Sequence, residues 1–508
     1  MINVLEYLEN TMKQIPNPDK TAFVGDSGEL TFNQLYCSSR AVGTFLKEND
    51  IHRQPVIVFM EKSADMIAAF FGAVYGGNYY VPIDVEMPAF RIQLILQTVN
   101  PPLIICDETT QALAETWGLP CKLFSDISLH PIDDTALMQI REQAVDTDPL
   151  YVVFTSGSTG IPKGVIACHR SVIDYIDSLS DVLDIGADTV FGNQSPLYLD
   201  ACLKELYPTV KYGATTYLIP RSLFMFPVKL VEYINENNIN TICWVASALS
   251  LVAGVGTLDK FKPHTLHTIA FGSEVFPIKH FNSWRVALPQ ARFIHLYGPT
   301  EATGMSTYYE ADRTFGADES IPIGRPFVNT EIVLIDDKNN RPPVGEAGEI
   351  CIRGTCLSLG YFGDIERTQA AFVQNPLSPF PDTIYRTGDM GYIGKNGELY
   401  FIARKDHQIK HMGQRIELAE IEWVANNCNS IQMACAVFDS EKSRIILYYM
   451  PQGDSDKIAV MAELKADLPR FMVPHAIFPV ESLPMTAGGK FDRVGLLEKY
   501  KATTKKSK

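Results

Sequence analysis

The sequence predicts an α/β protein with a large N-terminal region of helix-covered sheets plus a small β unit, followed by a small α+β C-terminal domain. Three observations predict this. Apolar strand-like runs alternate with helical patterns, short turn-separated strands begin near residue 321, and a strand–helix–strand pattern resumes after residue 404. A chain of 508 residues also exceeds one ordinary core, so we expect several folding units.

The N-terminal region carries the repeating pattern of parallel sheets. Short apolar runs at 55–60 and 79–83 alternate with helix-like stretches, and the same rhythm returns at 215–219, 241–245 and 268–271. This alternation is typical of β-α-β units, whose strands are parallel and whose helices cover the sheet.

The later part of the chain has a different sequence pattern. Between 321 and 403, short strands are separated by Gly, Pro and Asn turns, which predicts a small antiparallel β unit. We expect a large domain at 1–404 and a small domain at 405–500. The Lys-rich residues 501–508 are expected to be a disordered tail.

Composition narrows the function classes. A formal charge of −15 argues against nucleic acid as a partner, because binding to phosphate backbones depends on Lys and Arg. No apolar stretch is long enough to span a bilayer, and the acidic, amphipathic start lacks the features of a signal peptide, so we expect no membrane insertion and a cytoplasmic location. The ten cysteines are scattered without zinc-site spacing, which favours free thiols.

A loop of small hydroxyl residues and glycines follows the apolar strand at 151–154. Backbone N–H groups and hydroxyls of such a loop can converge on phosphate oxygens, and Lys163 can add positive charge. The Walker A spacing is absent, and Pro162 stands where a P-loop helix would begin. The alternative is a flexible Gly/Ser turn. The phosphate-binding candidates are Thr155, Ser156, Gly157, Ser158, Thr159 and Lys163.

This loop resembles the signature of the adenylate-forming superfamily, which includes acyl-CoA synthetases, luciferases and the adenylation domains of nonribosomal peptide synthetases. Further segments resemble the core motifs of amino-acid adenylation domains, in the family's order. They span nearly the whole chain and are 30–35, 76–84, 297–301, 348–354, 385–389, 405–410 with 413–417, and 489–493.

The resemblance implies ATP and Mg²⁺ as cofactors and assigns roles to single residues. Lys490 would bridge the substrate carboxylate and ATP during adenylation, and Glu301 would help to hold Mg²⁺ beside the phosphates. Tyr297 would stack on adenine, Thr300 would contact phosphate, and Asp389 would accept both ribose hydroxyls. The remaining residues of the implied ATP site are Gly272, Ser273, Glu274, His295, Gly298 and Arg404.

Three positions carry further expectations. His295 stands where amino-acid adenylation domains usually have Asn, and a neutral imidazole nitrogen can still accept from the adenine amino group. Asp406 falls at the family hinge between two domains that rotate between reaction steps. Gly413 would lie beside the path of the pantetheine arm, where the lack of a side chain matters. For Asp406 and Gly413 the alternative is an ordinary interdomain turn.

The segment around Asp200 resembles the pocket of enzymes that activate α-amino acids. A carboxylate there would bind the substrate ammonium, although Asp200 is also suited to be a helix N-cap. Lys204 could pair with a substrate side-chain carboxylate, with Glu205 or with water. Small substrates remain open, because large side chains restrict the pocket. By resemblance, the pocket is lined by Asp200, Ala201, Lys204, Cys243, Ile269, Phe271, Leu296, Gly304, Met305 and Lys490.

The expected function is that of a stand-alone amino-acid adenylation enzyme, similar to D-alanine carrier-protein ligases. It would form an aminoacyl-AMP and pass the aminoacyl group to the phosphopantetheine thiol of a separate carrier protein, since no carrier-type or condensation-type segment occurs in the sequence. An acyl- or aryl-CoA ligase of the same superfamily is one alternative. A nucleotide-binding regulator without turnover is another.

Overall fold

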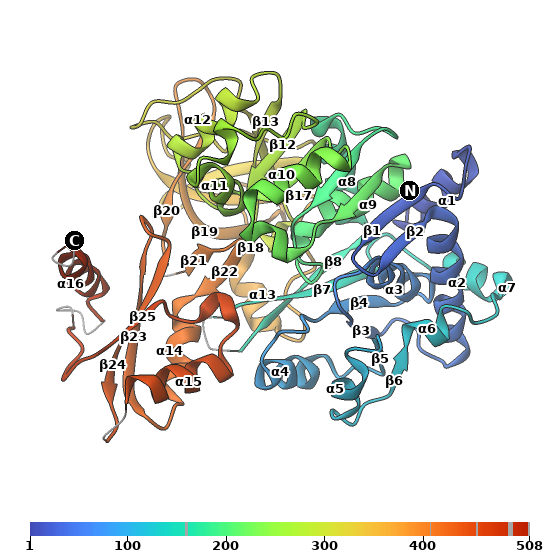
Figure 1. The fold of residues 1–508 in the computed structure, drawn as a ribbon, viewed down its shortest axis with the longest axis horizontal. Helices are drawn as coiled ribbons and strands as arrows, with labels where there is room; N and C mark the ends of the chain where they lie inside the picture. The colour runs from blue at the N-terminus through green and yellow to red at the C-terminus, as the bar shows by residue number, and fades with distance from the viewer. Residues whose placement is uncertain (158–160, 407, 454–455, 486–490, 506–508) are drawn as a thin grey trace. The chain divides into compact units, whose positions relative to one another are not determined.

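The computed structural model describes residues 1–157, 161–406, 408–453, 456–485 and 491–505 (Figure 1). The chain forms two compact units. The first comprises Met1–Val85, Thr98–Val153 and Gly164–Lys405, and the second comprises Glu86–Gln97, Phe154–Lys163 and Asp406–Lys508. Two short N-terminal segments therefore group with the C-terminal residues, which the expected boundary near residue 404 did not anticipate.

A six-stranded sheet has the order β6-β5-β3-β4-β7-β8. The pairings of β3 with β4 and β5, of β5 with β6 and of β4 with β7 are parallel, as the alternating pattern predicted. Its strands are β3 (Pro55–Phe59), β4 (Tyr79–Pro82), β5 (Leu103–Cys106), β6 (Cys121–Leu123), β7 (Pro149–Thr155) and β8 (Lys163–Cys168).

A nine-stranded sheet has the order β15-β14-β13-β12-β11-β9-β10-β1-β2. Its central pairings from β1 to β13 are parallel, whereas β2, β14 and β15 pair antiparallel at the edges. Its strands are β1 (Thr21–Gly25), β2 (Gly28–Thr31), β9 (Val190–Asn193), β10 (Thr215–Leu218), β11 (Thr241–Val245), β12 (Thr268–Gly272), β13 (Arg292–Tyr297), β14 (Thr307–Glu310) and β15 (Arg325–Pro326).

The predicted antiparallel β unit is a five-stranded sheet. Its strands pair in the order β16-β17-β19-β18, and β20 pairs with β19. They are β16 (Thr330–Ile335), β17 (Gly348–Gly354), β18 (Phe372–Gln374), β19 (Thr383–Ile393) and β20 (Leu399–Arg404).

The C-terminal residues combine helices with two small sheets, as expected for an α+β domain. One sheet is the hairpin β21 (Gln408–His411) and β22 (Gln414–Glu417), and the other has the order β23-β24-β25. The latter strands are β23 (Ile431–Asp439), β24 (Arg444–Pro451) and β25 (Ala476–Pro479), and the helices are α14 (Leu418–Asn426), α15 (Lys457–Asp467) and α16 (Arg493–Lys505). Since α16 continues to Lys505, residues 501–505 are helical, and the expectation of a disordered tail from 501 was wrong there. The buried Tyr500 anchors this helix against β23 and β24.

Helices cover the parallel sheets (Figure 1). The capping box explains one of the early motifs: Thr31 Oγ1 accepts from the Gln34 backbone N–H, and the Gln34 side chain accepts from the Thr31 N–H. This motif therefore begins a helix. The helices before residue 406 are α1 (Leu5–Gln14), α2 (Phe32–Glu48), α3 (Ala64–Tyr75), α4 (Ala89–Val99), α5 (Gln111–Glu115), α6 (Phe124–Ile127), α7 (Asp134–Glu142), α8 (His169–Leu183), α9 (Leu203–Tyr212), α10 (Pro227–Glu236), α11 (Ala246–Gly254), α12 (Ile278–Ala287) and α13 (Ile365–Ala371).

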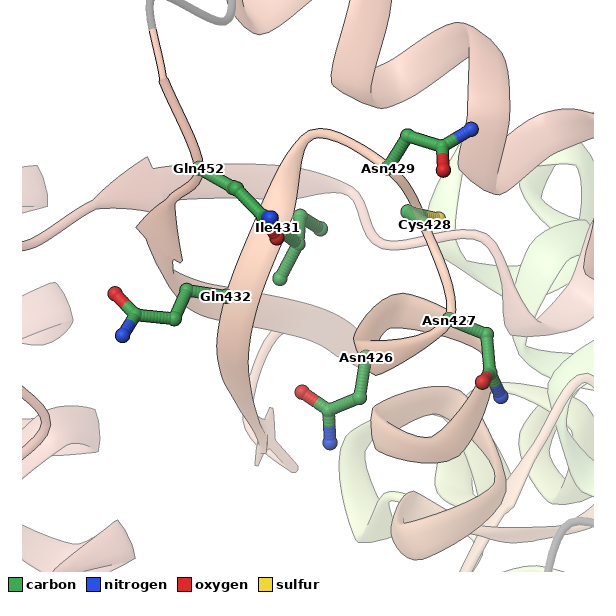
Figure 2. Close-up of a pocket in the computed structure, with 7 residues that line it drawn as sticks. All are labelled: Asn426, Asn427, Cys428, Asn429, Ile431, Gln432 and Gln452. Atoms are coloured by element: carbon green, nitrogen blue, oxygen red, sulfur yellow. The ribbon is translucent and has the colours of Figure 1, made fainter.

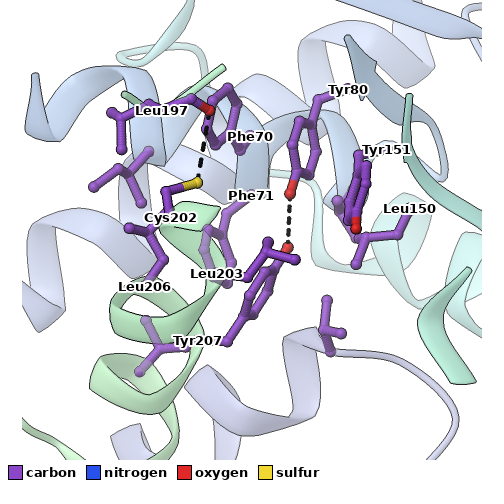
Figure 3. Close-up of a cluster of buried hydrophobic side chains, with 14 of the residues drawn as sticks. Phe70, Phe71, Tyr80, Leu150, Tyr151, Leu197, Cys202, Leu203, Leu206 and Tyr207 are labelled. Carbon is purple, nitrogen blue, oxygen red and sulfur yellow. Dashed lines mark hydrogen bonds between the residues drawn. The ribbon is translucent and has the colours of Figure 1, made fainter. Parts of the chain in front are cut away.

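The largest apolar core joins α9 to the strands of the six-stranded sheet. Tyr207 of α9 and Tyr80 of β4 are both buried, and their hydroxyls lie 3.1 Å apart (Figure 3). Phe70 of α3 stacks on Tyr80 with ring centroids 4.3 Å apart. Each such aromatic side chain contributes about 2 kcal/mol by burial. This core fixes the start of α9, which carries the candidate residues for binding the acid.

No helix in the described part of the chain is long and apolar enough to cross a bilayer. All ten cysteines are free thiols, as the sequence predicted.

Candidate active site

Asp389 is held by two donors inside the first unit. Its carboxylate is 4% exposed; Oδ2 accepts a 2.6 Å hydrogen bond from the Tyr297 hydroxyl, and Oδ1 accepts one of 2.6 Å from Arg404 Nη1. Burial, together with the negative charge of Asp389, raises the pKa of Tyr297 well above its ordinary value, so the phenol remains a donor. The structure thus brings together three predicted ATP-site residues, from β13, β19 and the end of β20.

Thr387 completes this arrangement. Its hydroxyl accepts from the Asp389 backbone N–H at 2.9 Å and donates to the Ile350 carbonyl at 2.7 Å, while its own carbonyl accepts from Arg404 Nη2 at 3.0 Å. The backbone and side chain of Asp389 are therefore both fixed. A carboxylate oxygen can accept more than one hydrogen bond, so the group retains capacity for the hydroxyls of a sugar.

Glu301 lies in the 3₁₀ turn Thr300–Ala302 and is fully buried. Its Oε1 accepts a 2.7 Å hydrogen bond from the Tyr361 hydroxyl, which orients the carboxylate. Across the described ranges, no cluster of three or more His, Cys, Asp or Glu residues could hold a metal ion. A single oriented carboxylate nevertheless suits Mg²⁺, which proteins usually bind through one or two carboxylates together with substrate phosphates.

His295 occupies β13 beside Phe271 of β12. The two rings are stacked, with centroids 4.9 Å apart and planes inclined by 10°. His295 Nδ1 lies 2.7 Å from the Pro322 carbonyl oxygen, so this nitrogen carries the proton and donates. With the proton on Nδ1, Nε2 of a neutral ring is an acceptor, which is the form required for a contact with the adenine amino group.

The end of β12 and the residues that follow it are closely packed. A side chain at Gly272 would place its Cβ 2.2 Å from the Leu296 carbonyl oxygen, so only glycine fits there. Ser273 adopts a positive φ of 66°. Glu274 accepts a 2.9 Å hydrogen bond from the Ser247 N–H in the first turn of α11, which gives this carboxylate a structural role. Thr300 begins the 3₁₀ turn that contains Glu301, and Gly298 lies just before this turn; both residues are partly exposed.

The described part of the phosphate loop belongs to the second unit and is already hydrogen-bonded. Ser156 is 1% exposed; its hydroxyl donates to the Arg415 carbonyl at 2.7 Å and accepts from the Glu417 N–H at 3.2 Å. The Gly157 N–H donates to Glu420 Oε2 at 3.2 Å. Thr155 Oγ1 is buried without a partner among the described residues. Lys163 is 9% exposed at the start of β8.

Three predicted site residues, Ser158, Thr159 and Lys490, lie outside the described residues. Their roles in phosphate binding and in adenylation stay predictions.

The structure separates the expected lining of the acid pocket into two sets. Side chains of a strand alternate between faces, and the parallel register pairs Cys243 with Ala270 but Trp244 with Phe271. Cys243, Leu296 and Met305 therefore belong to the core that contains α8 and α9, whereas Ile269 and Phe271 belong to the core beneath α11 and α12. The expectation that all five residues line one pocket is therefore corrected, because side chains that alternate along a strand place these residues in two different cores.

Asp200 begins a 3₁₀ turn, Asp200–Cys202, that leads into α9, and Ala201 follows it. Leu199, not Asp200, is the capping residue of this turn, so the N-cap alternative does not hold. Lys204 and Glu205 follow in the first turn of α9 and are 4% and 0% exposed. Burial raises the pKa of Glu205 to about 7, although Lys204, Lys62 and a hydrogen bond from Asn193 act against the rise.

Gly304 and Met305 follow the turn that carries Glu301. Gly304 has a φ of +92°, and a Cβ at this position would lie 3.0 Å from the ring of Tyr175 on α8. Only glycine satisfies both the backbone angle and this close approach.

Asp406 and Gly413 lie at the start of the C-terminal part of the second unit. Asp406 Oδ1 accepts from the Gln408 N–H at 3.1 Å, directly before β21. Met412 and Gly413 form the two-residue turn between β21 and β22, with φ values of 53° and 76°. The positive φ of this turn is sufficient to explain why residue 413 is a glycine. The hinge role of Asp406 and the pantetheine path at Gly413 stay predictions.

The second unit also has a hollow of about 480 Å³ lined mainly by amides (Figure 2). None of the predicted site residues lines it; the lining residues are Asn426, Asn427, Cys428, Asn429, Ile431, Gln432 and Gln452.

Sequence reasoning missed several residues that support the site. Tyr361, Asn193 and Lys62 carry no local signal, because their contacts to Glu301, Glu205 and the β9 backbone arise only on folding. Thr387 lies inside a recognised motif and could have been found there.

Known proteins resemble this chain over most of its length. A family model described as AMP-binding enzyme matches residues 12–362. D-alanine–D-alanyl carrier protein ligase from Bacillus licheniformis is 30% identical over 513 residues, which cover 95% of this chain and 96% of the ligase. Surfactin synthase subunit 1 from Bacillus subtilis is 29% identical over 94% of this chain, but the chain spans only 13% of that protein.

A solved structure agrees in fold. Holo-PA1221, an NRPS protein containing adenylation and PCP domains bound to a vinylsulfonamide inhibitor, superposes with a TM-score of 0.83 at 25% sequence identity. The match covers 98% of this chain and 84% of that one.

Proposed function

Because this chain belongs to the family of AMP-binding enzymes, we propose that it activates an amino acid with ATP and loads it onto a separate carrier protein. The observation that carries the proposal is the end-to-end match with D-alanine–D-alanyl carrier protein ligase, 96% of which this chain covers. That relative is named for the transfer of an amino acid to a carrier.

The proposed reaction has two steps. A carboxylate oxygen of the amino acid attacks the α-phosphorus of ATP, and pyrophosphate leaves with the electrons of the broken P–O bond. The phosphopantetheine thiol of the carrier, after losing its proton, attacks the carbonyl carbon, and AMP leaves as the thioester forms. Both steps bring anions together, so the chain must supply positive charge and positioning.

The geometry at Asp389 supports the nucleotide part of the proposal. A buried carboxylate fixed by Tyr297 and Arg404 is suited to accept the two ribose hydroxyls, and the fixed geometry lowers the entropy lost on binding. His295 would accept from the adenine amino group through Nε2. Lys490 would approach the substrate carboxylate, and Asp200 would bind the α-ammonium by charge-assisted hydrogen bonds.

Glu301 would hold Mg²⁺ together with the phosphates of ATP. The ion would offset phosphate charge during attack by the carboxylate. Tyr361 keeps Glu301 oriented through its 2.7 Å hydrogen bond. We place the reaction in the cytoplasm, where the free thiols of this chain remain reduced.

The proposal is tested by measuring pyrophosphate release from ATP with each common L- and D-amino acid, with Lys490→Ala as the inactive control. We expect one amino acid or a small group to give a signal that the variant loses. A second assay follows transfer of that amino acid to a purified phosphopantetheinylated carrier by mass spectrometry. Activity only with acids that lack an amino group, and transfer to free coenzyme A, would instead identify an acyl- or aryl-CoA ligase.

A further inference from the structure

The first turn of α9 contributes to a buried cluster of charged and polar groups. Lys204 and Glu205 are 4% and 0% exposed, and Asn193 from the end of β9 donates a 3.3 Å hydrogen bond to Glu205 Oε2. Lys62, which follows β3, donates a 3.3 Å hydrogen bond to the Asn193 carbonyl oxygen. The cluster therefore joins loops and helices of the first unit at one buried place.

Lys204 makes no direct ion pair in this cluster. Neighbouring residues of a helix do not face each other, and no ion pair within 4.0 Å or hydrogen bond joins the Lys204 ammonium to another residue of the described ranges. Glu205 acts on Lys204 only at longer range. The expected alternative of a Lys204–Glu205 pair is therefore not formed. Lys204 is only 4% exposed as a residue, and a charge with so little access to water is costly unless a partner compensates it, so a ligand carboxylate is the natural partner.

Further polar atoms around this place are buried without partners in the described residues. They include Glu205 Oε1, Asn193 Oδ1 and the hydroxyls of Tyr151 and Tyr175. Both tyrosines are fully buried, and the negative charge of nearby Asp200 helps to raise their pKa values, so both stay protonated. These phenols can donate hydrogen bonds to an anion. A concentration of unsatisfied groups of this kind marks a place where a polar ligand completes the bonding.

The charges of the cluster favour one sign of ligand. Lys62 and Lys204 are cations. Once Asp200 is assigned to the α-ammonium, Glu205 is the carboxylate that acts on both lysines, and Asp26 acts on Lys62 as well. Burial lowers the pKa of Lys62 to about 8 and raises that of Glu205 to about 7, so near neutral pH Glu205 is only partly ionised and compensates Lys204 incompletely. A substrate side-chain ammonium would repel Lys204, and an apolar side chain would leave Lys204 without a direct partner.

We propose that the amino acid activated by this chain has an acidic side chain, whose carboxylate pairs with the Lys204 ammonium beside Glu205 and Lys62. The proposal rests on the proposed function and deepens it by naming the substrate class. Asp200 would bind the α-ammonium, the α-carboxylate would react with ATP, and the second carboxylate would enter the cluster. Lys204 is then a specificity-determining residue, and Lys62 is a positioning residue that acts through Asn193.

The first test is the wild-type enzyme with matched pairs of substrates. Pyrophosphate release is measured for L- and D-glutamate and aspartate against glutamine, asparagine and alanine. Each acid and its amide have nearly the same shape, so the difference isolates the charge. We expect kcat/KM for the preferred acid to exceed that of its amide by about 10–100-fold, the range for a charge-assisted hydrogen bond. Equal rates, or a preference for a neutral or basic amino acid, would overturn the proposal.

The second test changes Lys204. Lys204→Gln should lower kcat/KM for the acid and raise that for the amide, so that the ratio falls by about 10–100-fold. Lys211→Gln is the matched control, because this lysine stands in the last turn of the same helix and pairs with Asp177. It should leave the ratio unchanged. If Lys204→Gln does not fold, as judged by circular dichroism, the wild-type comparison alone decides the proposal.

The two proposals fail in different ways. Activity with a neutral amino acid that is lost in Lys490→Ala would support the proposed function and contradict the proposal of an acidic substrate side chain. If the wild-type enzyme releases no pyrophosphate with any amino acid, both proposals are wrong. Calorimetry with non-reactive glutamyl and glutaminyl sulfamoyl-adenosines gives a readout without turnover, and tighter binding of the glutamyl compound is expected.

Discussion

Tyr297 and Asp389, 92 residues apart in the chain, are joined by a 2.6 Å hydrogen bond from the phenol to the carboxylate. Tyr297 ends β13 of the nine-stranded sheet, and Asp389 lies within β19 of the antiparallel sheet. Arg404 holds the other carboxylate oxygen from the end of β20. Two sheets thus meet at one carboxylate, and the proposed ribose contact depends on both.

Replacing Asp389 with Asn should weaken ATP binding by about 10–100-fold, because an amide accepts less strongly than a carboxylate and loses the charge that holds Arg404. Calorimetric titration with ATP checks the expected loss. Asp337→Asn is the control, since Asp337 is an exposed partner of Lys405. An unchanged affinity in Asp389→Asn would contradict the ribose role.

Glu301→Gln should raise the Mg²⁺ concentration for half-maximal pyrophosphate release by at least about tenfold, because a neutral amide is a poor ligand for a hard cation. Tyr361→Phe should give a smaller shift, since it removes only the hydroxyl that orients Glu301. Glu310→Gln, on the surface beside Arg292, serves as the control. Identical Mg²⁺ curves for all three variants would exclude Glu301 as a ligand.

His169 should make the stability of the first unit depend on pH. It is 3% exposed and its Nδ1 accepts from the Val4 N–H, and burial lowers the pKa of its ring to about 3. Below the unfolded pKa of about 6.5, His169 binds a proton in the unfolded chain but not in the folded chain. The free energy of unfolding therefore decreases by about 1.4 kcal/mol for each unit by which the pH is lowered.

Urea unfolding at pH 7.5 and 5.0 measures this effect of His169. Between these values the wild type should lose about 2 kcal/mol more than His169→Gln, whose amide does not titrate. Equal losses in the two proteins would show that another group is responsible.

Gly304→Ala should destabilise the protein more than Gly345→Ala. Both glycines have a φ near +90°, at +92° and +90°, but a Cβ at Gly304 meets the Tyr175 ring at 3.0 Å, whereas one at Gly345 meets nothing within 4 Å. The backbone strain of about 1–3 kcal/mol is therefore shared, and the difference reports the contact. Denaturant unfolding of both variants measures it, and equal losses would mean that Tyr175 moves aside freely.

Apolar runs with turn signals were sufficient to predict the architecture. The run at 241–245 is β11 and that at 79–83 contains β4, because a buried parallel strand needs a continuous apolar segment. The grouping of Glu86–Gln97 with the C-terminal residues could not be foreseen. It depends on non-local contacts, such as the buried ion pair between Arg91 and Glu420.

The candidate site was only partly predictable. Motif order located Tyr297, Asp389 and Glu301, but local sequence does not show which face of a strand a side chain takes when every residue of β12 is buried. Ile269 and Phe271 were therefore grouped with Cys243, from which the register separates them. The lack of a Lys204–Glu205 pair likewise depends on side-chain directions in the first turn of α9.

The side chains of β12 alternate between two faces, so the neighbouring residues Ala270 and Phe271 pack into different cores. A larger side chain at Ala270 would press towards Cys243 and α9, on the side proposed for the acid. A smaller one at Phe271 would instead remove the ring that stacks on His295, on the side proposed for adenine. Under the proposed function, a substitution at Ala270 would therefore change the acid that is activated, whereas a substitution at Phe271 would change the recognition of the nucleotide.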